Sequence, residues 1–295
     1  MEWELVGTLI VAGLGALGVQ RAYAAGRAEE ERLDAVWSAA ANRVRGELEV
    51  TKGTFFRDPV RRIQLRHGDV PIVVSTTRET ALGGDKVSYT VVTAGPLEAL
   101  HDVEMRVEPR GLIALGKVWK RLRLAEVATH DEPFDMEFRV HGSPAAVVRE
   151  LLDVGLRGAL SEVGEGFQIS EGRIVVAREG VPRDPSIIVS IVTFVETIAA
   201  RWARMVELPH TLAEALDLEE VEGEPGIIAR GRRRGRTVTL EIRVGPERLS
   251  TVVWFESITG ERVEVAREGL VSDREEMVRA VDAAIDAEHG AGAYR

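Results

Sequence analysis

The densest group of side chains able to bind a metal or transfer protons lies in the segment 130–142. Imidazole and carboxylate groups suit divalent metals, and the same groups can act as general acids and bases. The candidate residues are His130, Asp131, Asp135, Glu137 and His141. Together they are typical of an enzyme, for example a metal-assisted hydrolase.

A strand over 134–140 would explain the same polar pattern without any ligand. Alternate side chains of a strand point to opposite faces, so Asp135, Glu137 and His141 would share one face. Arg139 lies in the middle of that face and would repel a metal cation. We therefore expect a solvated strand face, assign no catalytic or metal-binding residue, and expect no cofactor. The enzyme stays as the alternative hypothesis.

The strongest basic cluster contains Arg230, Arg232, Arg233, Arg234 and Arg236, on a stretch whose glycines predict a hairpin tip. Such a tip could contact anionic lipid headgroups or nucleic-acid phosphates. The preceding segment 214–224 is acidic and carries no basic residue. We expect the arginines to be solvated or paired within the chain, with a lipid surface as the next alternative and nucleic acid as the least favoured.

Motifs of well-known catalytic and nucleotide-binding sites are incomplete. Gly111–Lys117 fits half of a phosphate-binding loop, but Val118 stands where a Ser or Thr should hold magnesium. A short amphipathic helix over 111–124 is the simpler explanation of that segment. The chain has no cysteine nucleophile and no His-Glu-x-x-His sequence.

The composition excludes several classes of protein. With 45% hydrophobic residues among 295, the chain is too apolar for disorder. The absence of cysteine excludes disulfide-stapled folds and Cys-ligated metal sites. A net charge of −10 disfavours a surface built for nucleic acid.

An apolar stretch near the start predicts a membrane anchor over residues 1–26. Residues 5–19 carry no charge and, with their flanks, allow about 20 apolar residues, enough to cross a bilayer. A cleaved signal peptide and a buried core helix are the alternatives. Basic Arg21, Arg27 and Arg32 all follow the span, which predicts a single-pass membrane protein with its bulk in the cytoplasm. Small residues spaced four apart could pair such spans in a homo-oligomer.

The remainder predicts an α+β fold. An amphipathic helix with Leu33, Trp37 and Val44 follows the anchor, and the period then changes to two. The expected elements are an antiparallel meander (59–66, 69–77, 86–94, 103–108), a helix capped by Ser143, short strands near 167–170 and 173–178, a buried helix to about 206, a helix near 211–218, strands near 226–231, 236–244, 249–257 and 262–267, and a final helix after a capping box at Ser272.

The segment 173–181 repeats at 262–270, because both contain a strand that ends in Ala-Arg-Glu-Gly and leads into a helix. This similarity predicts a degenerate tandem repeat, with a first α+β module over 27–206 and a second, shorter one over 207–295. Convergence on a common strand–turn–helix sequence is the alternative.

The segment Phe134-Asp135-Met136-Glu137-Phe138-Arg139-Val140-His141-Gly142 and the helix after it resemble a group of uncharacterised bacterial single-pass membrane proteins. These combine an N-terminal membrane helix with a Phe-Asp-x-x-Phe-x-Val-x-Gly motif, and the resemblance covers residues 1–206. It implies an anchor and a strand-rich module but no activity.

These observations favour a membrane-tethered, non-catalytic interaction or scaffold protein with an unknown protein partner. The alternative is an enzyme that uses the 130–141 polar cluster.

Overall fold

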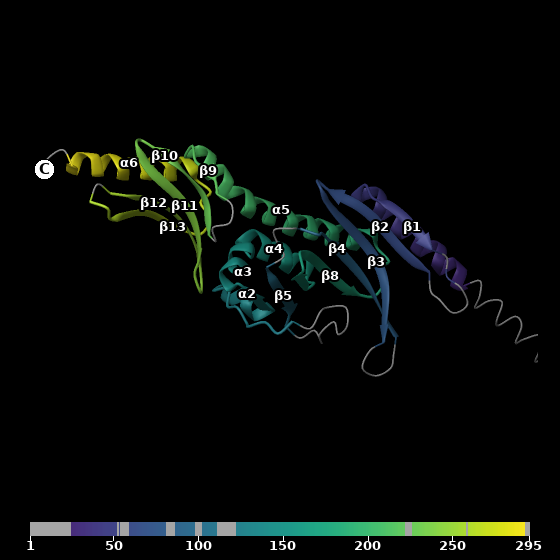
Figure 1. The fold of residues 1–295 in the computed structure, drawn as a ribbon. Coiled ribbons are helices and arrows are strands. Elements are labelled where there is room, and N and C mark those ends of the chain that lie inside the picture. Colours follow the sequence, from purple (N-terminus) through teal and green to yellow (C-terminus); the bar gives the residue numbers. More distant parts are fainter. Residues whose placement is uncertain are drawn as a thin grey trace, which may run out of the picture.

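The computed structural model describes residues 25–51, 53, 59–80, 86–97, 102–110, 122–221, 226–257 and 259–292. The fold is α+β, as expected, with two antiparallel sheets of eight and five strands, which we call the large sheet and the small sheet. The molecule is elongated (Figure 1), with the helix over 25–44 at one end and the small sheet at the other. The predicted anchor over 1–26 lies outside the described residues, apart from its last two.

The large sheet has the strand order β1-β2-β3-β4-β8-β7-β5-β6. Its strands are β1 (Glu47–Thr51), β2 (Val60–His67), β3 (Val70–Thr80), β4 (Lys86–Ala94), β5 (Glu104–Pro109), β6 (Phe138–Ser143), β7 (Phe167–Ser170) and β8 (Arg173–Glu179). The predicted meander is confirmed for β2, β3 and β4. It is wrong for the strand at 103–108, because β5 pairs with β6 and β7 and not with β4. Local alternation predicts a strand but not its long-range partner.

The predicted strand over 134–140 is wrong in its first half. Residues Glu132–Glu137 form a short helix, α2, and β6 begins only at Phe138. The Asp131 carboxylate accepts a 3.3 Å hydrogen bond from the Phe134 N–H, and Pro133 occupies the first turn. Both features favour a helix start. Asp135 and Glu137 therefore do not share a strand face with His141.

Two helices replace the single helix expected after Ser143. These are α3 (Ala145–Leu151) and α4 (Val154–Val163). Ser143 is the last residue of β6 and does not cap α3, whose N-cap position is Pro144 without a side-chain hydrogen bond. Asp153 caps α4 by accepting a 2.8 Å hydrogen bond from the Leu156 N–H. Asp153 therefore begins a second helix within the apolar stripe that predicted a single one.

The long helix α5 (Pro185–Ala215) joins the two halves of the molecule. Its 31 residues include the buried helix expected to about 206 and the first part of the one expected near 211–218, because the helix ends at Ala215. Side chains as far as Met205 belong to the core of the large sheet, whereas Leu212 and Ala213 belong to the core of the small sheet. By length and apolar composition α5 could cross a membrane, but it packs against β3, β4, β8 and α4 as a core helix.

The small sheet has the strand order β13-β12-β11-β10-β9. Its strands are β9 (Glu219–Glu220), β10 (Ile227–Arg233), β11 (Arg236–Val244), β12 (Leu249–Glu256) and β13 (Arg262–Glu268), and the final helix is α6 (Arg274–Gly292). Strands β10 to β13 match the expected positions, whereas β9 was not expected. The capping box at Ser272 is wrong by one residue, because Asp273 accepts a 2.9 Å hydrogen bond from the Glu276 N–H.

The order β1-β2-β3-β4-β8 in the large sheet corresponds to β9-β10-β11-β12-β13 in the small sheet. Each series is preceded and followed by a helix, and α5 takes part in both. The pairing registers also agree strand by strand. The directly paired residues form the rows Leu48, Ile63, Val74, Val92, Val176 and Glu220, Ala229, Leu240, Val253, Val265. The segment 95–172, which adds β5, β6 and β7, corresponds to the short turn between β12 and β13.

The junction after the last strand of each series also has the same geometry. Gly180 lies four residues after Val176 and Gly269 four residues after Val265, the last residues of the two rows. Their φ angles are 90° and 76°. Gly180 N–H donates to the Ser88 carbonyl oxygen at 2.7 Å, and Gly269 N–H donates to that of Leu249 at 2.8 Å. Each glycine is followed four residues later by the aspartate that caps the next helix, Asp184 or Asp273. The sequence repeat is therefore Ala-Arg-Glu-Gly-x-x-x-Asp.

Candidate functional site

The carboxylates of the 130–141 segment bind groups of their own chain. Asp135 accepts hydrogen bonds from the Thr129 hydroxyl at 2.8 Å and from the Thr129 N–H at 3.2 Å. Asp131 caps α2 and also lies 2.9 Å from Arg157 Nε. Glu137 accepts a 2.9 Å hydrogen bond from the Ser161 hydroxyl. Each carboxylate thus holds a turn or helix end in place.

The two histidines do not converge with these carboxylates. His130 is exposed with φ of 63°, and His141 lies on β6 opposite Arg106. Among the described residues, no group of three His, Asp or Glu side chains has the arrangement of a metal site. The geometry of the segment is that of a capped turn, and it offers no assembled metal or acid–base centre.

Packing accounts for each defined position of the Phe-Asp-x-x-Phe-x-Val-x-Gly motif. Phe134 and Phe138 stack in the core with ring centroids 5.0 Å apart, and Val140 is buried beside them. A Cβ at Gly142 would lie 2.5 Å from Val148 Cγ2, so only glycine lets α3 approach β6 this closely. With Asp135 bound to Thr129, the motif describes how a helix, a strand and a second helix fit together.

The arginine cluster lies on the β10–β11 hairpin, whose turn is Arg234-Gly235. Arg233 Nε and Nη2 donate to the two oxygens of Asp282 at 2.6 and 2.9 Å. Arg234 pairs with Asp286 at 2.5 Å and with Asp282 at 3.2 Å. The hydrogen bonds from Arg233 lower the pKa of Asp282. Helix α6 therefore supplies the neutralising charge at the tip.

The acidic segment 214–224 also contacts the cluster, because Arg233 Nη1 donates a 3.2 Å hydrogen bond to the Leu216 carbonyl oxygen. Glu219, in β9, lies opposite Arg230 in the strand register. Arg230 Nε also donates to the Thr239 hydroxyl at 3.4 Å, and Arg236 contacts the Glu256 carbonyl oxygen at 3.5 Å. Arg232 is exposed. The cluster is thus a partly neutralised hairpin face.

A second charged group covers the outer face of the small sheet, away from α6. Arg243 lies between Glu241 and Glu264, with N–O distances of 2.9 and 2.6 Å. Arg262 pairs with the same two carboxylates and stacks 4.0 Å above the ring of Trp254. Hydrogen bonds from Arg243 lower the pKa of both glutamates. This network shields the outer face of the sheet.

Sequence reasoning missed a buried arginine beneath the first helix. The Arg61 side chain is only 4% exposed, and it binds Asp34 at 2.8 Å and Glu30 at 2.5 Å. Both carboxylates lie on the helix over 25–44, which also buries Trp37 in the core of the large sheet. The sequence did contain a signal. Alternate residues of a strand face the same side, so Arg61 should face the core together with Ile63 and Leu65.

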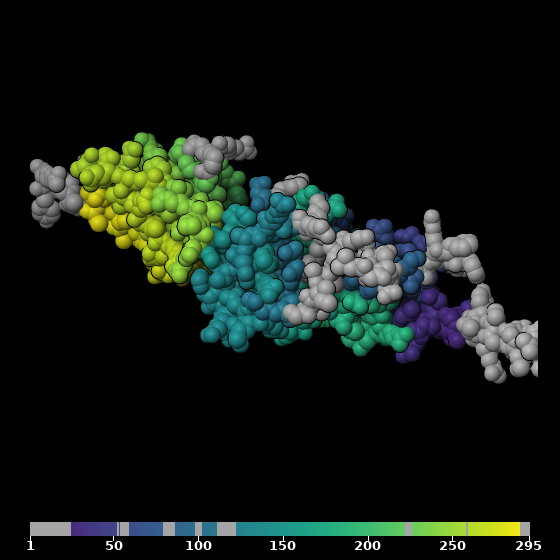
Figure 2. Space-filling view, turned by 90° about the horizontal axis from the view of Figure 1, so that it is seen from below, coloured from purple at the N-terminus to yellow at the C-terminus, as the bar shows by residue number. Residues whose placement is uncertain are grey.

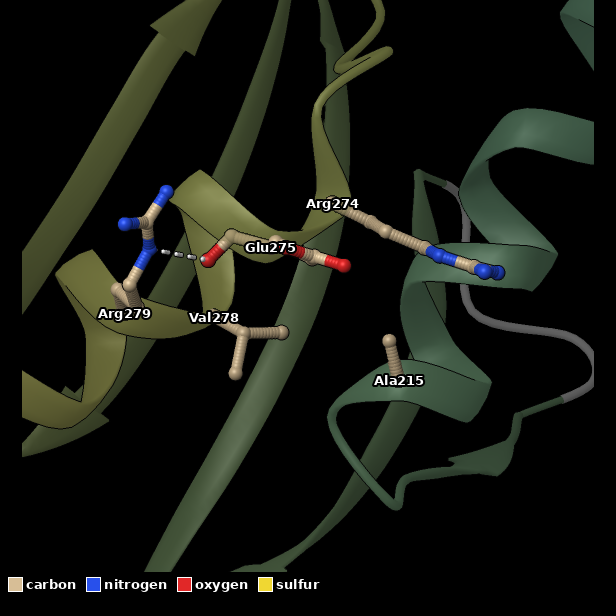
Figure 3. Close-up of a pocket in the computed structure, with 5 residues that line it drawn as sticks. All are labelled: Ala215, Arg274, Glu275, Val278 and Arg279. Atoms are coloured by element: carbon tan, nitrogen blue, oxygen red, sulfur yellow. Dashed lines mark hydrogen bonds between the residues drawn. The ribbon is translucent and has the colours of Figure 1, made fainter.

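One described pocket, of about 390 Å³, lies between the end of α5 and the start of α6. Figure 3 shows Arg274 reaching toward α5 near Ala215, whereas Arg279 turns back to donate a 3.3 Å hydrogen bond to the Glu275 carbonyl oxygen. Among the described residues that line the pocket, Val278 is the one large apolar side chain. The charged residues that line this pocket are exposed, and none of them belongs to the predicted sites.

The phosphate-loop-like segment 111–117, and the helix expected there, lie outside the described residues except for 122–124, which are not helical. The chain matches no protein-family model, and comparisons with curated proteins and with solved structures give no significant match.

Proposed function

We propose that this chain is a membrane-tethered, non-catalytic scaffold that holds a protein partner at a fixed place relative to the bilayer. The observation that carries the proposal is the attachment of the helix over 25–44 to the large sheet. Arg61 binds Glu30 and Asp34 on that helix, and Arg183 pairs with Glu29 at 2.9 Å. An anchor in residues 5–19 would end only a few residues before this helix, so the body would be held close to the bilayer.

The elongated body supports the same proposal. Figure 2 shows the C-terminal part of the chain (yellow-green) at one end of the elongated body and the first described residues (purple) toward the other. The single helix α5 enters both cores, which gives the joint a continuous backbone. We further propose that the two series of strands are a degenerate tandem repeat with α5 shared between the copies. Equal strand registers and equal Gly–Asp junctions support this reading better than convergence does.

Charge determines the orientation that we propose. Arg21, Arg27 and Arg32 follow the apolar segment and no basic residue precedes it, which favours a cytoplasmic body in a bacterial inner membrane. The arginine hairpin is less suited to anionic lipid than its sequence suggests, because Arg233 and Arg234 already pair with α6. We therefore propose a protein partner for the body, and contact with lipid through the anchor.

Membrane fractionation tests the tether. The full chain should remain in the membrane fraction after high-salt and alkaline washes. Leu9→Arg combined with Leu14→Arg should release it, because each central arginine costs about 2.5–3.5 kcal/mol in a membrane helix. The matched control is Val154→Arg combined with Val244→Arg, at exposed positions outside the apolar segment, and this variant should stay membrane-bound. A wild-type chain released by washing would contradict the tether.

A complementation experiment separates the scaffold from the enzyme. His130→Ala with His141→Ala removes both histidines of the polar cluster, and we expect this variant to restore a deletion strain as well as the wild type does. Arg61→Leu, which detaches the first helix from the sheet, should fail to restore it at equal protein level. The opposite ranking would support catalysis by the polar cluster. A C-terminal reporter active only in the periplasm should remain silent if the body is cytoplasmic.

A further inference from the structure

The corresponding strands β8 and β13 differ in their neighbours. β8 lies between β4 and β7, whereas β13 lies at the edge of the small sheet with β12 as its one partner among the described strands. In the large sheet, β7 covers this edge by antiparallel pairing with residues 173–176 of β8. The equivalent residues of β13, 262–265, have no such cover in the described part of the chain. In the large sheet, the edge of β8 that corresponds to the open edge of β13 is thus paired with an antiparallel strand.

The hydrogen-bonding groups that face outward from β13 can be identified. Gly269 N–H donates to the Leu249 carbonyl oxygen, so this pair is a hydrogen-bonded one. Bonded and non-bonded pairs alternate along an antiparallel ladder. Residues 263, 265 and 267 therefore bond to β12, and the N–H and C=O groups of Arg262, Glu264, Ala266 and Glu268 point away from the sheet. An uncovered row of this kind is a template for strand addition.

We propose that this edge pairs with β13 of a second copy of the chain, in antiparallel register about Val265. Three symmetric registers pair the four outward residues near the middle of the strand. One places Glu264 opposite Glu264, and another places Glu264 opposite Glu268. Only the third avoids like charges, because it places Arg262 opposite Glu268 of the second copy and Glu264 opposite Ala266.

The side chains of this register are free enough to form the contacts. Arg262 is 41% exposed and Glu268 is 60% exposed, so each can reach across the new boundary while keeping its neighbours in the small sheet. Val265 would face Val265 of the second copy, as a non-hydrogen-bonded pair. The interface comprises one short strand from each copy. Its buried area would therefore be below the roughly 1,200–2,000 Å² that a stable complex buries. A weak, reversible dimer follows, and it does not depend on the membrane anchor.

The absence of cysteine makes a disulfide test unambiguous. Opposite Cα atoms in a non-hydrogen-bonded pair lie about 4.5 Å apart, within the range of a disulfide. Full-length Val265→Cys should form a covalent dimer on mild oxidation. Val244→Cys is the matched control, because Val244 ends β11 and is 55% exposed. Equal yields from the two variants, or no dimer from Val265→Cys, would overturn the proposal.

A charge exchange tests the register within the Val265→Cys background. Arg262→Glu alone places Glu opposite Glu twice, and Glu268→Arg alone places Arg opposite Arg twice, so each variant should dimerise at least about threefold less than the parent. A mixture of the two variants restores both opposite-charge pairs, and the mixed dimer should return to the parental yield. A folding defect in either variant could not be rescued by mixing. A mixed dimer no more abundant than either homodimer would exclude this register.

Discussion

The hydroxyl of Thr251 donates a 2.8 Å hydrogen bond to the carbonyl oxygen of Gly269, at the point where β13 ends and the chain turns toward α6. Thr90 makes the same bond to Gly180 at 2.9 Å, before α5. Both threonines are 1% exposed. Each bond ties the turn after the last strand to the neighbouring strand, so the two helices start from equivalent positions relative to their sheets.

Removing either hydroxyl should destabilise the fold. We expect Thr90→Val and Thr251→Val each to lower the free energy of unfolding by about 1 kcal/mol, because a part-buried carbonyl oxygen loses its side-chain donor while the volume of the side chain is kept. Urea denaturation measures the change. Thr237→Val, at an exposed position of β11, is the control and should change stability little. Equal effects at Thr237 and Thr251 would show that the hydroxyl of Thr251 contributes nothing specific.

The two junction glycines should resist substitution, although Gly180 has open space around it. Gly180→Ala and Gly269→Ala each force a side chain into a left-handed backbone conformation, at a cost of about 1–3 kcal/mol. Gly158→Ala, inside α4 and with no atom within 4 Å of the added Cβ, should instead stabilise the chain by about 0.5–1 kcal/mol. Thermal unfolding would show the opposite signs. A loss of stability from Gly158→Ala would mean that φ does not determine the response.

Adjacent arginines on β2 should behave differently. Arg61→Leu leaves Glu30 and Asp34 without their shared partner and should cost about 1–3 kcal/mol, less than a fully buried pair because both carboxylates are nearly half exposed. Arg62→Leu, at the next and exposed position, should change stability by less than about 0.5 kcal/mol. Proteolysis within residues 25–44 should increase only for the Arg61 variant. Equal proteolysis of the two variants would argue against the proposed attachment of the first helix.

The cap of α6 offers a direct comparison of neighbours. Asp273→Ala should destabilise α6 by about 1 kcal/mol, because the Glu276 N–H loses its acceptor. Ser272→Ala should have almost no effect, although sequence alone favours Ser272 as the cap. Hydrogen exchange of the first turn of α6 reports the difference. Faster exchange in the Ser272 variant would restore the capping box as the correct description.

Acid should weaken the small sheet and its helix first. Hydrogen bonds from Arg233 lower the pKa of Asp282, and those from Arg243 lower the pKa of Glu241 and Glu264. A carboxyl whose pKa is lower in the folded state stabilises the fold above its unfolded pKa, here 3.8 for Asp and 4.5 for Glu. That contribution is lost as the pH falls from about 4.5 through the lowered values.

Hydrogen exchange of β11–β13 between pH 5 and pH 3 would measure this loss. Asp282→Asn should weaken the region already at pH 7 and flatten its response to acid. Glu261→Gln, at an exposed turn position, should leave both unchanged. A steeper acid response in the Asp282 variant would contradict the assigned sign.

The strands were predictable where one face is buried along their whole length. In β2, Ile63 and Leu65 alternate with exposed residues, and this local pattern fixes the strand. It failed at 134–137 because four residues of alternation also fit one turn of a helix, and Asp131 with Pro133 decides for the helix. Alternation also says nothing about strand order, so the pairing of β5 with β6 and β7 was beyond its reach.

The candidate site was less predictable than the fold, because its residues find their partners through tertiary packing. Asp135 meets Thr129 only because α2 turns back over the preceding segment. Arg233 meets Asp282 across 49 residues of sequence, a distance that no local sequence pattern could bridge. Arg61 could have been found from its parity with Ile63, but its two carboxylates could not.

The number of residues in the shared helix α5 between the two cores helps to set the orientation of one sheet relative to the other. Met205 packs in the core of the large sheet and Leu212 in the core of the small sheet. The rotation of the helix between these two residues therefore contributes to the angle between the sheets. Each residue of an α-helix turns the chain by about 100° and advances it by about 1.5 Å. One residue inserted between these positions would swing the far sheet by more than a quarter of a revolution while barely lengthening the molecule. Such a rotation would also break the contacts between α3 and β12 and the 2.7 Å hydrogen bond from Arg149 Nη1 to the Glu247 carbonyl oxygen.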